Sequence, residues 1–323
     1  MKMLKGAAAA LLALTAGVLI SGPARAQETT LTAVVFVPRN TTFGEIFVRF
    51  VDRVNNEGKG LVKIELRGGP DAIPTFEQGN AVRTGVVDMV SLAPTFYTNV
   101  CPECDAQILA PLHTPQLKKT PFWNVLQKYT TQKLNAHTLS AYGDGVGFHI
   151  WTTKAPPGGS LKGMRLRTTP NYTPLFQALG VSLVQTAPGE VLTALERGVV
   201  DGYGWPAIGM FDLGWGPHTK YRIDPGFYNV IVNVLVNENK WKSLREDQRA
   251  FLNKMAAWLE SENLRWVEER KAADEKKIKE AGIQIVDLGA NHRKTAYDAY
   301  WDALLKRAPE PTKELKAASD ALR

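Results

Sequence analysis

Two stretches of this chain share one pattern and decide its fold: AVRTGVVD at residues 81–88 and ALERGVVD at residues 194–201. In each, a helix is predicted to end, a glycine takes the C-cap position, and a short buried strand closes with an aspartate. Each stretch follows a β-rich segment, at residues 61–66 and 181–185, and a turn marked by proline, at Pro74 and Pro188. The alternative is a chance likeness between two short apolar strings. If the likeness is real, each half repeats a βαβ unit, which predicts two related lobes with mostly parallel sheets covered by helices.

The segments around these stretches fit the same α/β class. Strands are predicted at residues 31–37, 89–93, 139–151, 164–168 and 229–236, and helices at residues 43–56, 122–134 and 172–179. Residues 246–281 contain neither Pro nor Gly, and one helix of that length would reach roughly 54 Å at 1.5 Å per residue. We therefore expect a long helix that bridges both lobes. Two helices with a kink near Glu262 are the alternative.

The first 26 residues have the order of a secretory signal peptide. Lys2 and Lys5 precede an apolar run at residues 6–20, and Pro23 precedes the small-x-small sequence at residues 24–26. The run is too short for a comfortable membrane span, although an uncleaved N-terminal anchor is the alternative. We expect cleavage after Ala26 and export from the cytosol, where the mature protein meets no ATP or NAD pool.

The charge of the chain limits its partners. The sequence contains 39 basic and 32 acidic residues, a net charge of +7, and removal of the three basic residues of the signal peptide leaves +4. No cluster of Lys and Arg is interleaved with aromatic residues, so the sequence does not predict nucleic-acid binding. A mild positive charge favours anionic ligands or an anionic membrane surface.

Cys101 and Cys104 have the spacing C-x-x-C and are the two cysteines of the chain. A redox pair, two ligands of a metal site and a structural disulfide are all open. No second Cys pair or His cluster supplies further metal ligands, and Asp105 rather than a helical run follows the pair. We therefore expect a structural disulfide without redox turnover.

The sequence offers no catalytic motif. It lacks the G-x-S-x-G elbow, the H-E-x-x-H motif and the P-loop, and its five histidines are scattered. The remaining enzyme hypothesis is a secreted hydrolase with His149 as its base.

Two segments predict a ligand site instead. In LKGMRLRT, at residues 161–168, Arg165 and Arg167 share one face of a predicted strand. An arginine at the C-terminal end of such a strand can hold a carboxylate through two parallel hydrogen bonds, whereas two solvated arginines are the alternative. The Gly-rich segment DGYGWP, at residues 201–206, can line a cleft with Trp205; the alternative places Trp205 in the core.

The mature chain resembles, over nearly its whole length, the DctP-type solute-binding subunit of TRAP (tripartite ATP-independent periplasmic) transporters. Residues 161–167 look like the family signature L-K-G-L-K-x-R, and further matches lie at residues 178–180, 188–191, 194–202, 237, 241, 244 and 248. The resemblance implies a two-lobed periplasmic binding protein with a ligand cleft between the lobes. It would capture an organic acid and present it to membrane subunits that use an ion gradient. The lobes would comprise residues 27–146 plus 233–268 and residues 147–232 plus 269–323.

The resemblance also implies roles for single residues. The last arginine of the signature is the family's carboxylate clamp, which is Arg167 in this chain. A second arginine of the family aligns with His149, and the Glu-Trp pair of the branch that binds 2-oxo acids aligns with Gly204 and Trp205. Because Gly204 offers no carboxylate for a cation, we predict neither a metal nor another cofactor.

We therefore expect a periplasmic solute-binding protein, not an enzyme, for a monocarboxylate with an apolar or aromatic tail, especially a 2-oxo or aromatic acid. Loops at strand ends would supply its apolar walls. The predicted binding residues are Arg167, Trp205, His149, Phe36, Phe96 and Tyr97. A binding protein that serves a signalling receptor is a second hypothesis without catalysis.

Overall fold

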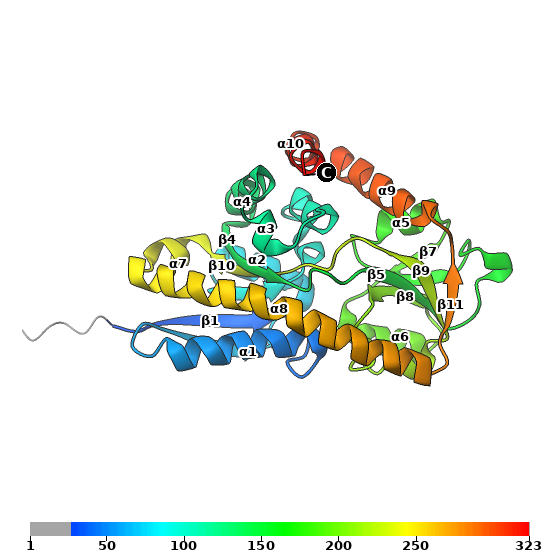
Figure 1. Cartoon of the computed structure of the whole chain (residues 1–323), viewed down its shortest axis with the longest axis horizontal. Coiled ribbons are helices and arrows are strands. Elements are labelled where there is room, and N and C mark those ends of the chain that lie inside the picture. The colour runs from blue at the N-terminus through cyan, green and yellow to red at the C-terminus, as the bar shows by residue number, and fades with distance from the viewer. Residues whose placement is uncertain (1–26, 323) are drawn as a thin grey trace, which may run out of the picture.

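The chain forms two α/β lobes, each built on one sheet, in a computed structural model that describes residues 27–322 (Figure 1). The predicted signal peptide lies outside the described residues. The strand order is β2-β1-β3-β10-β4 in the first lobe and β11-β9-β5-β8-β6-β7 in the second. Two of the four strand pairings in the first sheet and three of the five in the second are parallel, so each sheet joins a parallel block to antiparallel strands.

The elements have the following bounds. The first sheet contains β1 (Thr29–Val35), β2 (Val62–Gly68), β3 (Met89–Leu92), β4 (Ala136–Tyr142) and β10 (Val232–Asn237). The second contains β5 (Phe148–Thr152), β6 (Arg165–Thr168), β7 (Ser182–Gln185), β8 (Gly202–Pro206), β9 (Tyr221–Phe227) and β11 (Gln284–Asp287). The α-helices are α1 (Thr42–Glu57), α2 (Gln78–Thr84), α3 (Thr114–Leu117), α4 (Pro121–Leu134), α5 (Thr173–Ala178), α6 (Val191–Glu196), α7 (Glu238–Ser243), α8 (Glu246–Glu280), α9 (Asn291–Arg307) and α10 (Pro309–Asp320). Two short 3-10 helices matter for the site, η2 (Pro94–Tyr97) and η3 (Pro102–Leu109).

The internal repeat is present in the backbone hydrogen bonds of both lobes. In the first lobe the backbone N–H of Thr32 in β1 donates to Asp88 at 2.8 Å. In the second lobe the backbone N–H of Arg165 in β6 donates to Asp201 at 3.0 Å. Each aspartate stands just before the strand that pairs in parallel with the donor's strand, β3 or β8. The two stretches therefore belong to equivalent βαβ units, as predicted.

The expectation of a short buried strand before each aspartate is wrong, although Val87 and Val200 are buried. Val86 and Val199 are 71% and 44% exposed, and β3 and β8 begin only after the aspartates. Gly85, with φ of 79°, ends α2 and turns the chain, and the aspartate rather than the valines ties that turn to the sheet. The short apolar run reflects the turn and not a strand.

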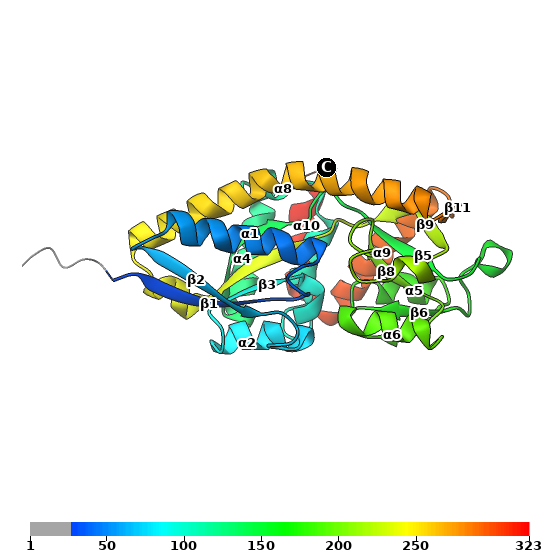
Figure 2. The ribbon, with the colours of Figure 1, turned by 90° about the horizontal axis from the view of Figure 1, so that it is seen from below.

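The long helix α8 is continuous from Glu246 to Glu280, which confirms the single-helix prediction. It packs on β4 and α1 of the first lobe. In the second lobe, Asp274 accepts a hydrogen bond from the backbone N–H of Gly209 at 2.6 Å, and Glu275 accepts one from Arg222 at 2.9 Å. Figures 1 and 2 show α8 running alongside both lobes, so it connects them.

The prediction of one strand at residues 139–151 is wrong, because this stretch crosses between the lobes. Its first part is β4 of the first sheet and its last part is β5 of the second. Gly143 and Gly145 adopt φ of 90° and 95° in the crossing segment, a conformation that glycine accepts without steric cost. The chain returns between β9 and β10, where the backbone N–H of Val230 donates to the carbonyl of Val146 at 2.9 Å. These two paired crossings form a hinge beside α8.

The C-terminal segment also links the lobes. Helix α9 packs against α5 and β9, whereas α10 packs against α4 of the first lobe. Glu314 of α10 accepts hydrogen bonds from Lys128 and Tyr129 at 2.9 and 2.6 Å. The prediction assigns residues 269–323 to the second lobe, whereas α10, which falls in that range, packs against the first lobe. The division of the chain at these residues remains a proposal.

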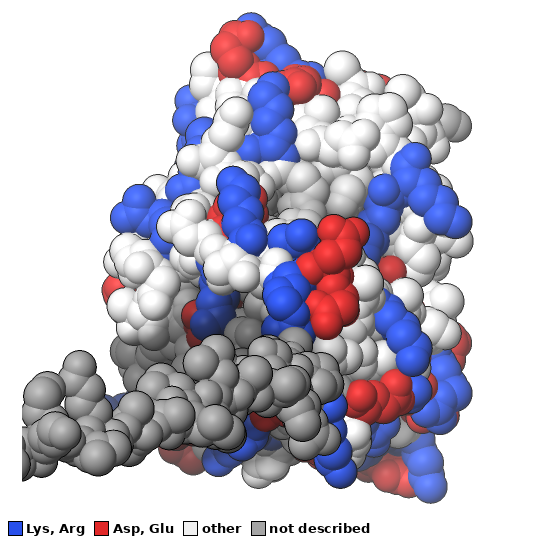
Figure 3. Space-filling model, turned by 90° about the vertical axis from the view of Figure 1, so that its left-hand side faces the viewer, with Lys and Arg blue, Asp and Glu red and all other residues white. Residues whose placement is uncertain are grey.

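Charged side chains are mixed over the surface that can be seen. On the end of the molecule shown in Figure 3, lysine and arginine are interspersed with aspartate and glutamate, without a continuous basic field on the described residues of that face. Within residues 27–322, no helix combines the length and the apolar character needed to cross a membrane.

Candidate functional site

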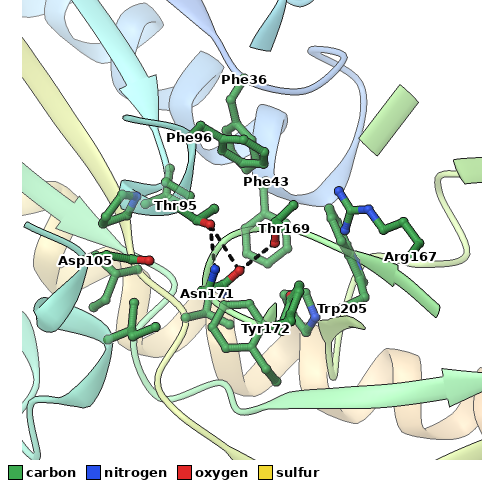
Figure 4. A pocket seen from close by; sticks show the side chains of 18 residues that line it. Phe36, Phe43, Thr95, Phe96, Asp105, Arg167, Thr169, Asn171, Tyr172 and Trp205 are labelled. Atoms are coloured by element: carbon green, nitrogen blue, oxygen red, sulfur yellow. Dashed lines mark hydrogen bonds between the residues drawn. The ribbon is translucent and has the colours of Figure 1, made fainter. Parts of the chain in front are cut away.

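A narrow cavity lies between the lobes, at the ends of their sheets, and the space in it that is open to the centre of a water-sized sphere is about 40 Å³. Figure 4 shows its wall. The first lobe contributes residues that directly follow β1 and β3, and the second contributes residues in and after β6 and β8. The lining consists of Phe36, Phe43, Ala93, Pro94, Thr95, Phe96, Asp105, Ile108, Phe148, Arg167, Thr169, Asn171, Tyr172, Trp205, Pro206, Val230, Ile231 and Val232. The predicted inter-lobe cleft is therefore present, at the carboxyl ends of parallel strands, where open α/β sheets bind their ligands.

Arg167 is the cation of this cavity. Its side chain is buried, with 1% of the residue exposed. Its Nε and Nη2 donate to the carbonyl of Thr186 at 3.1 and 2.9 Å, and its Nη1 donates to the carbonyl of Gly204 at 3.2 Å. These carbonyls fix the guanidinium plane but do not neutralise it, and no carboxylate within the described part of the chain forms an ion pair with it. Since a guanidinium has five N–H groups, one on each terminal nitrogen stays available.

Burial also affects the protonation of Arg167. Desolvation lowers its pKa to about 10, against the opposite influence of Tyr172 and Glu190. The group remains charged at neutral pH. A buried charge without a counter-charge costs several kcal/mol, so the cavity beside Arg167 favours an anion.

Aromatic rings form the walls around that position. The guanidinium carbon of Arg167 lies 5.9 Å from the ring centroid of Trp205. Trp205 is fixed because its Nε1 donates to the carbonyl of Ile208 at 3.1 Å. Phe43 meets Trp205 edge to face at 6.2 Å, and Phe36 and Phe96 lie 5.7 Å apart. The cavity thus places one cation among apolar surfaces from both lobes.

A hydrogen-bonded cluster joins the two lobes beside the cavity. The hydroxyl groups of Thr95 and Thr169 donate to the side-chain carbonyl of Asn171 at 3.1 and 2.5 Å. The backbone N–H of Asn171 donates back to the hydroxyl of Thr95 at 3.2 Å. Thr95 belongs to the first lobe, and Asn171 lies between β6 and α5 of the second. This cluster therefore closes one side of the cleft (Figure 4).

Asp105 lies across the cavity from Arg167 in Figure 4. It is fully buried in η3 and accepts a hydrogen bond from the hydroxyl of Tyr300 in α9. Burial raises its pKa to about 7, although Tyr300 and Arg307 oppose the rise. The segment begins at the Cys101–Cys104 disulfide, which confirms the predicted pairing.

Four of the six predicted binding residues line the cavity, namely Arg167, Trp205, Phe36 and Phe96. The described lining does not include Tyr97 or His149. The hydroxyl of Tyr97 instead accepts a hydrogen bond from the side-chain amide of Asn233 at 2.8 Å. Nδ1 of His149 lies 2.9 Å from Oδ1 of Asp224. The side chain of His149 lies on the face of β5 opposite that of Phe148, which lines the cavity. The hydrolase hypothesis requires His149 as the base, and His149 is not among the described residues of the lining.

Gly204 occupies a position where no larger residue fits. A Cβ atom there would approach the ring of Tyr172 to 2.7 Å. A glutamate, which the aligned branch has at this position, would therefore have to displace a wall of the cavity.

Sequence reasoning missed Phe43, Thr95, Asp105, Phe148, Thr169, Asn171 and Tyr172. A signal existed for Thr169, Asn171 and Tyr172, because they directly follow the strand that carries Arg167, at its carboxyl end. Phe148 directly precedes His149 in the chain. Because successive side chains of a strand point to opposite faces, only one of the two can line the cavity. Asp105 has no signal of this kind, since the tertiary packing of η3 and α9 places it.

Comparisons with known proteins agree with this geometry. The family model of the bacterial extracellular solute-binding proteins, family 7 (DctP), matches residues 33–308. A relative from Nostoc, a monocarboxylate 2-oxoacid-binding periplasmic protein, is 26% identical over 212 residues, which cover 62% of this chain and 57% of the relative.

Solved structures share the fold. A TRAP periplasmic solute-binding protein of Desulfovibrio salexigens with bound orotic acid superposes with a TM-score of 0.80 at 19% identity, covering 91% of this chain and 98% of that one. An extracytoplasmic solute receptor of Bordetella pertussis that binds pyroglutamic acid superposes with a TM-score of 0.77 at 17% identity, covering 90% and 99%. At such identities the likeness concerns the fold alone.

Proposed function

Because this chain belongs to family 7 of the bacterial extracellular solute-binding proteins, we propose that it captures a monocarboxylate in the periplasm and delivers it to TRAP membrane subunits. Members of this family are solute-binding transport proteins, not enzymes. The signal peptide would be removed after Ala26, and no metal or other cofactor takes part in binding. A 2-oxo, cyclic or aromatic acid is the ligand class.

One observation carries the proposal: Arg167 is a buried cation that forms no ion pair with any carboxylate of residues 27–322, and it lines a cavity between two lobes. A ligand carboxylate supplies the counter-anion. It accepts hydrogen bonds from the two N–H groups of Arg167 that do not donate to the carbonyls of Thr186 and Gly204. A planar guanidinium held in this way matches a carboxylate with two parallel hydrogen bonds. The ring of Trp205 then offers a flat apolar surface to the remainder of the acid.

The number of charges favours one carboxylate over two. Arg167 is the one cationic residue among the described residues of the lining, and Asp105 stands on the other side. A second ligand carboxylate would be buried without a cation and close to an acidic side chain, which costs several kcal/mol. Orotic acid and pyroglutamic acid, bound by two proteins of the same fold, each have a single carboxyl group.

The ligand class is tested by a thermal-shift screen of the mature protein. The panel contains pyruvate, 2-oxoisocaproate, benzoate, pyroglutamate and orotate, and it contains succinate and malate as C4 dicarboxylates. A ligand at 100 times its dissociation constant adds about 2.7 kcal/mol to the free energy of unfolding. Because the lining has one cation, the monocarboxylates should raise the melting temperature most. A C4 dicarboxylate with the largest shift would contradict the proposal and require a second cation.

The role of Arg167 is tested by calorimetry with the best acid of that panel. Arg167→Ala should weaken binding by about 3–5 kcal/mol, the cost of breaking a buried charged pair. Arg167→Lys should also weaken it strongly, because an ammonium cannot form two parallel hydrogen bonds. Arg165→Ala is the matched control: its side chain lies two residues earlier in β6, is 49% exposed and pairs with Asp201 at 3.1 Å. Binding by Arg167→Ala within threefold of the wild type would exclude Arg167 as the clamp.

A further inference from the structure

The cavity has a second polar group at Asp105, and one oxygen of its carboxylate has no hydrogen-bond partner among the residues that the structure describes. Its Oδ2 accepts the hydroxyl hydrogen of Tyr300. Its Oδ1 is buried and has no hydrogen-bond partner among the described residues. Buried polar atoms are almost always paired, so an unpartnered carboxylate oxygen at a cavity wall indicates that a ligand atom takes that place.

The hydroxyl groups of Tyr97, Tyr172 and Tyr228 are close enough to Asp105 to feel its charge, but none of them donates to Oδ1. The positive charge of Arg307 influences Asp105, but Nη2 of Arg307 donates to the carbonyl of Thr98 at 2.8 Å. The side chains that line the cavity with Asp105 from η3 and the hinge are apolar, namely Ile108, Val230, Ile231 and Val232. A donor for Oδ1 must therefore come from inside the cavity.

The chemistry of the two poles differs. Arg167 is a donor with a positive charge, and Asp105 is an acceptor that lines the same cavity and has one oxygen without a hydrogen-bond partner. Figure 4 shows the two side chains at opposite ends of the cavity, with Asn171 and Tyr172 between them. A ligand that satisfies both is polar at both ends and apolar along its middle.

We propose that the ligand carries a hydrogen-bond donor, an N–H or an O–H group, at the end opposite its carboxylate, and that Oδ1 of Asp105 accepts this hydrogen. The inference rests on the proposed function and narrows its ligand class. Simple fatty acids and unsubstituted aromatic acids fill the cavity but leave Asp105 unpaired. Lactams, imides and ω-hydroxy acids satisfy both poles.

Isosteric pairs of acids test the inference, because O–H and CH₃ differ little in size. The pairs are 4-hydroxybutanoate with pentanoate, 5-hydroxypentanoate with hexanoate, and 4-hydroxybenzoate with 4-methylbenzoate; pyroglutamate with N-methylpyroglutamate adds an N–H group. Affinities are measured by calorimetry on the wild type. Above pH 7 the carboxyl of Asp105 is mostly ionised, because burial raises its pKa to about 7. At such a pH we expect the donor acid of at least one pair to bind at least about tenfold more tightly, the effect of a hydrogen bond to a charged group.

Variants then assign the preference to Asp105. Asp105→Asn keeps an acceptor for Tyr300 but replaces the charged acceptor, and Asp105→Leu removes it. Both should reduce the preference to within about threefold, mainly through weaker binding of the donor acid. The control is Glu103→Gln, since Glu103 is equally buried in η3, pairs with Lys133 and does not line the cavity. A loss of protein stability alone would weaken the binding of both acids of a pair and leave the ratio of their affinities unchanged.

The outcomes separate this inference from the proposed function. If acids bind through Arg167 but no pair shows a donor preference, or if Asp105→Asn retains it, the inference is overturned and the proposed function stands. If no acid of the panel binds, or Arg167→Ala binds all of them normally, the proposed function fails and the inference fails with it.

Discussion

Asp105 makes the stability of the ligand-free protein depend on pH. Burial raises its pKa to about 7, while Tyr300 and Arg307 act in the opposite direction. The unfolded chain has the ordinary aspartate pKa, near 3.9. Between these values the native state binds more protons than the unfolded state, so the free energy of unfolding falls as pH rises. The contribution is complete below about pH 4 and is lost by the time the pH passes 7.

We therefore predict that the wild type loses stability relative to Asp105→Asn between pH 5 and pH 8. Urea unfolding of both proteins at four pH values measures this, and the difference between them removes the titration of the other groups. The Asn variant should become the more stable of the two, or approach the wild type, as pH increases. A difference independent of pH would show that Asp105 is ionised over the whole range.

At the scale of residues, the sequence could name a side chain of the cavity wall only where a motif contains it. Arg167 and Trp205 belong to segments with a recognisable order of residues, and both line the cavity. His149 was assigned by alignment alone, and the alternation of β5 places Phe148 in the wall instead. Asp105 faces the cavity because α9, almost 200 positions later in the chain, packs on η3. Such a contact leaves no trace in the local sequence.

Among the elements, η3 connects the disulfide to the site. Cys101 and Cys104 are bonded at its start, directly before Asp105. A cross-link over so short a loop removes little entropy from the unfolded chain, about 2 kcal/mol at room temperature.

We predict that the double variant Cys101→Ser, Cys104→Ser folds, with a free energy of unfolding about 2 kcal/mol lower than the oxidised wild type. Chemical unfolding of both proteins gives the comparison. Intact mass of the non-reduced periplasmic protein should be lower by the two thiol hydrogens. Two alkylatable cysteines in freshly isolated protein, or unchanged stability of the double variant, would contradict a structural disulfide.

Elements with a clear period were predictable, and those defined by tertiary contacts were not. Helix α1 buries Phe43, Phe47 and Phe50 at the spacing that the sequence shows, and β10 is buried along its whole length between β3 and β4. By contrast, residues 139–151 look like one loosened strand, but they enter two sheets. The division occurs at the hinge, where pairing with residue 230 decides the path of the chain.

At the scale of the whole molecule, polar contacts across the cleft hold the lobes together. The first backbone N–H of α1 donates to Asp212 of the second lobe at 3.1 Å, and the hydroxyl of Thr42 donates to the same oxygen. A carboxylate is favourable at a helix N-terminus, so Asp212 caps α1 only while the cleft is closed. Thr95 and Asn171 form the second contact of this kind.

We predict that Asp212→Asn shifts the population toward the open form. Losing a charged cap costs about 1 kcal/mol, which should weaken ligand binding roughly fivefold, mainly through faster dissociation. Stopped-flow dissociation with the best acid of the panel measures the rate. Asp247→Asn is the control, because Asp247 lies in the first turn of α8 and bonds to Arg245 within the same lobe. Equal dissociation rates for Asp212→Asn and the wild type would contradict the role of this contact.

The most direct test of the central claim is a crystal structure of the protein with the acid that gives the largest thermal shift. We predict that its carboxylate lies within about 3 Å of Nη1 and Nη2 of Arg167, beside the ring of Trp205. A carboxylate bound elsewhere, with Arg167 still bonded to Thr186 and Gly204 alone, would contradict the account.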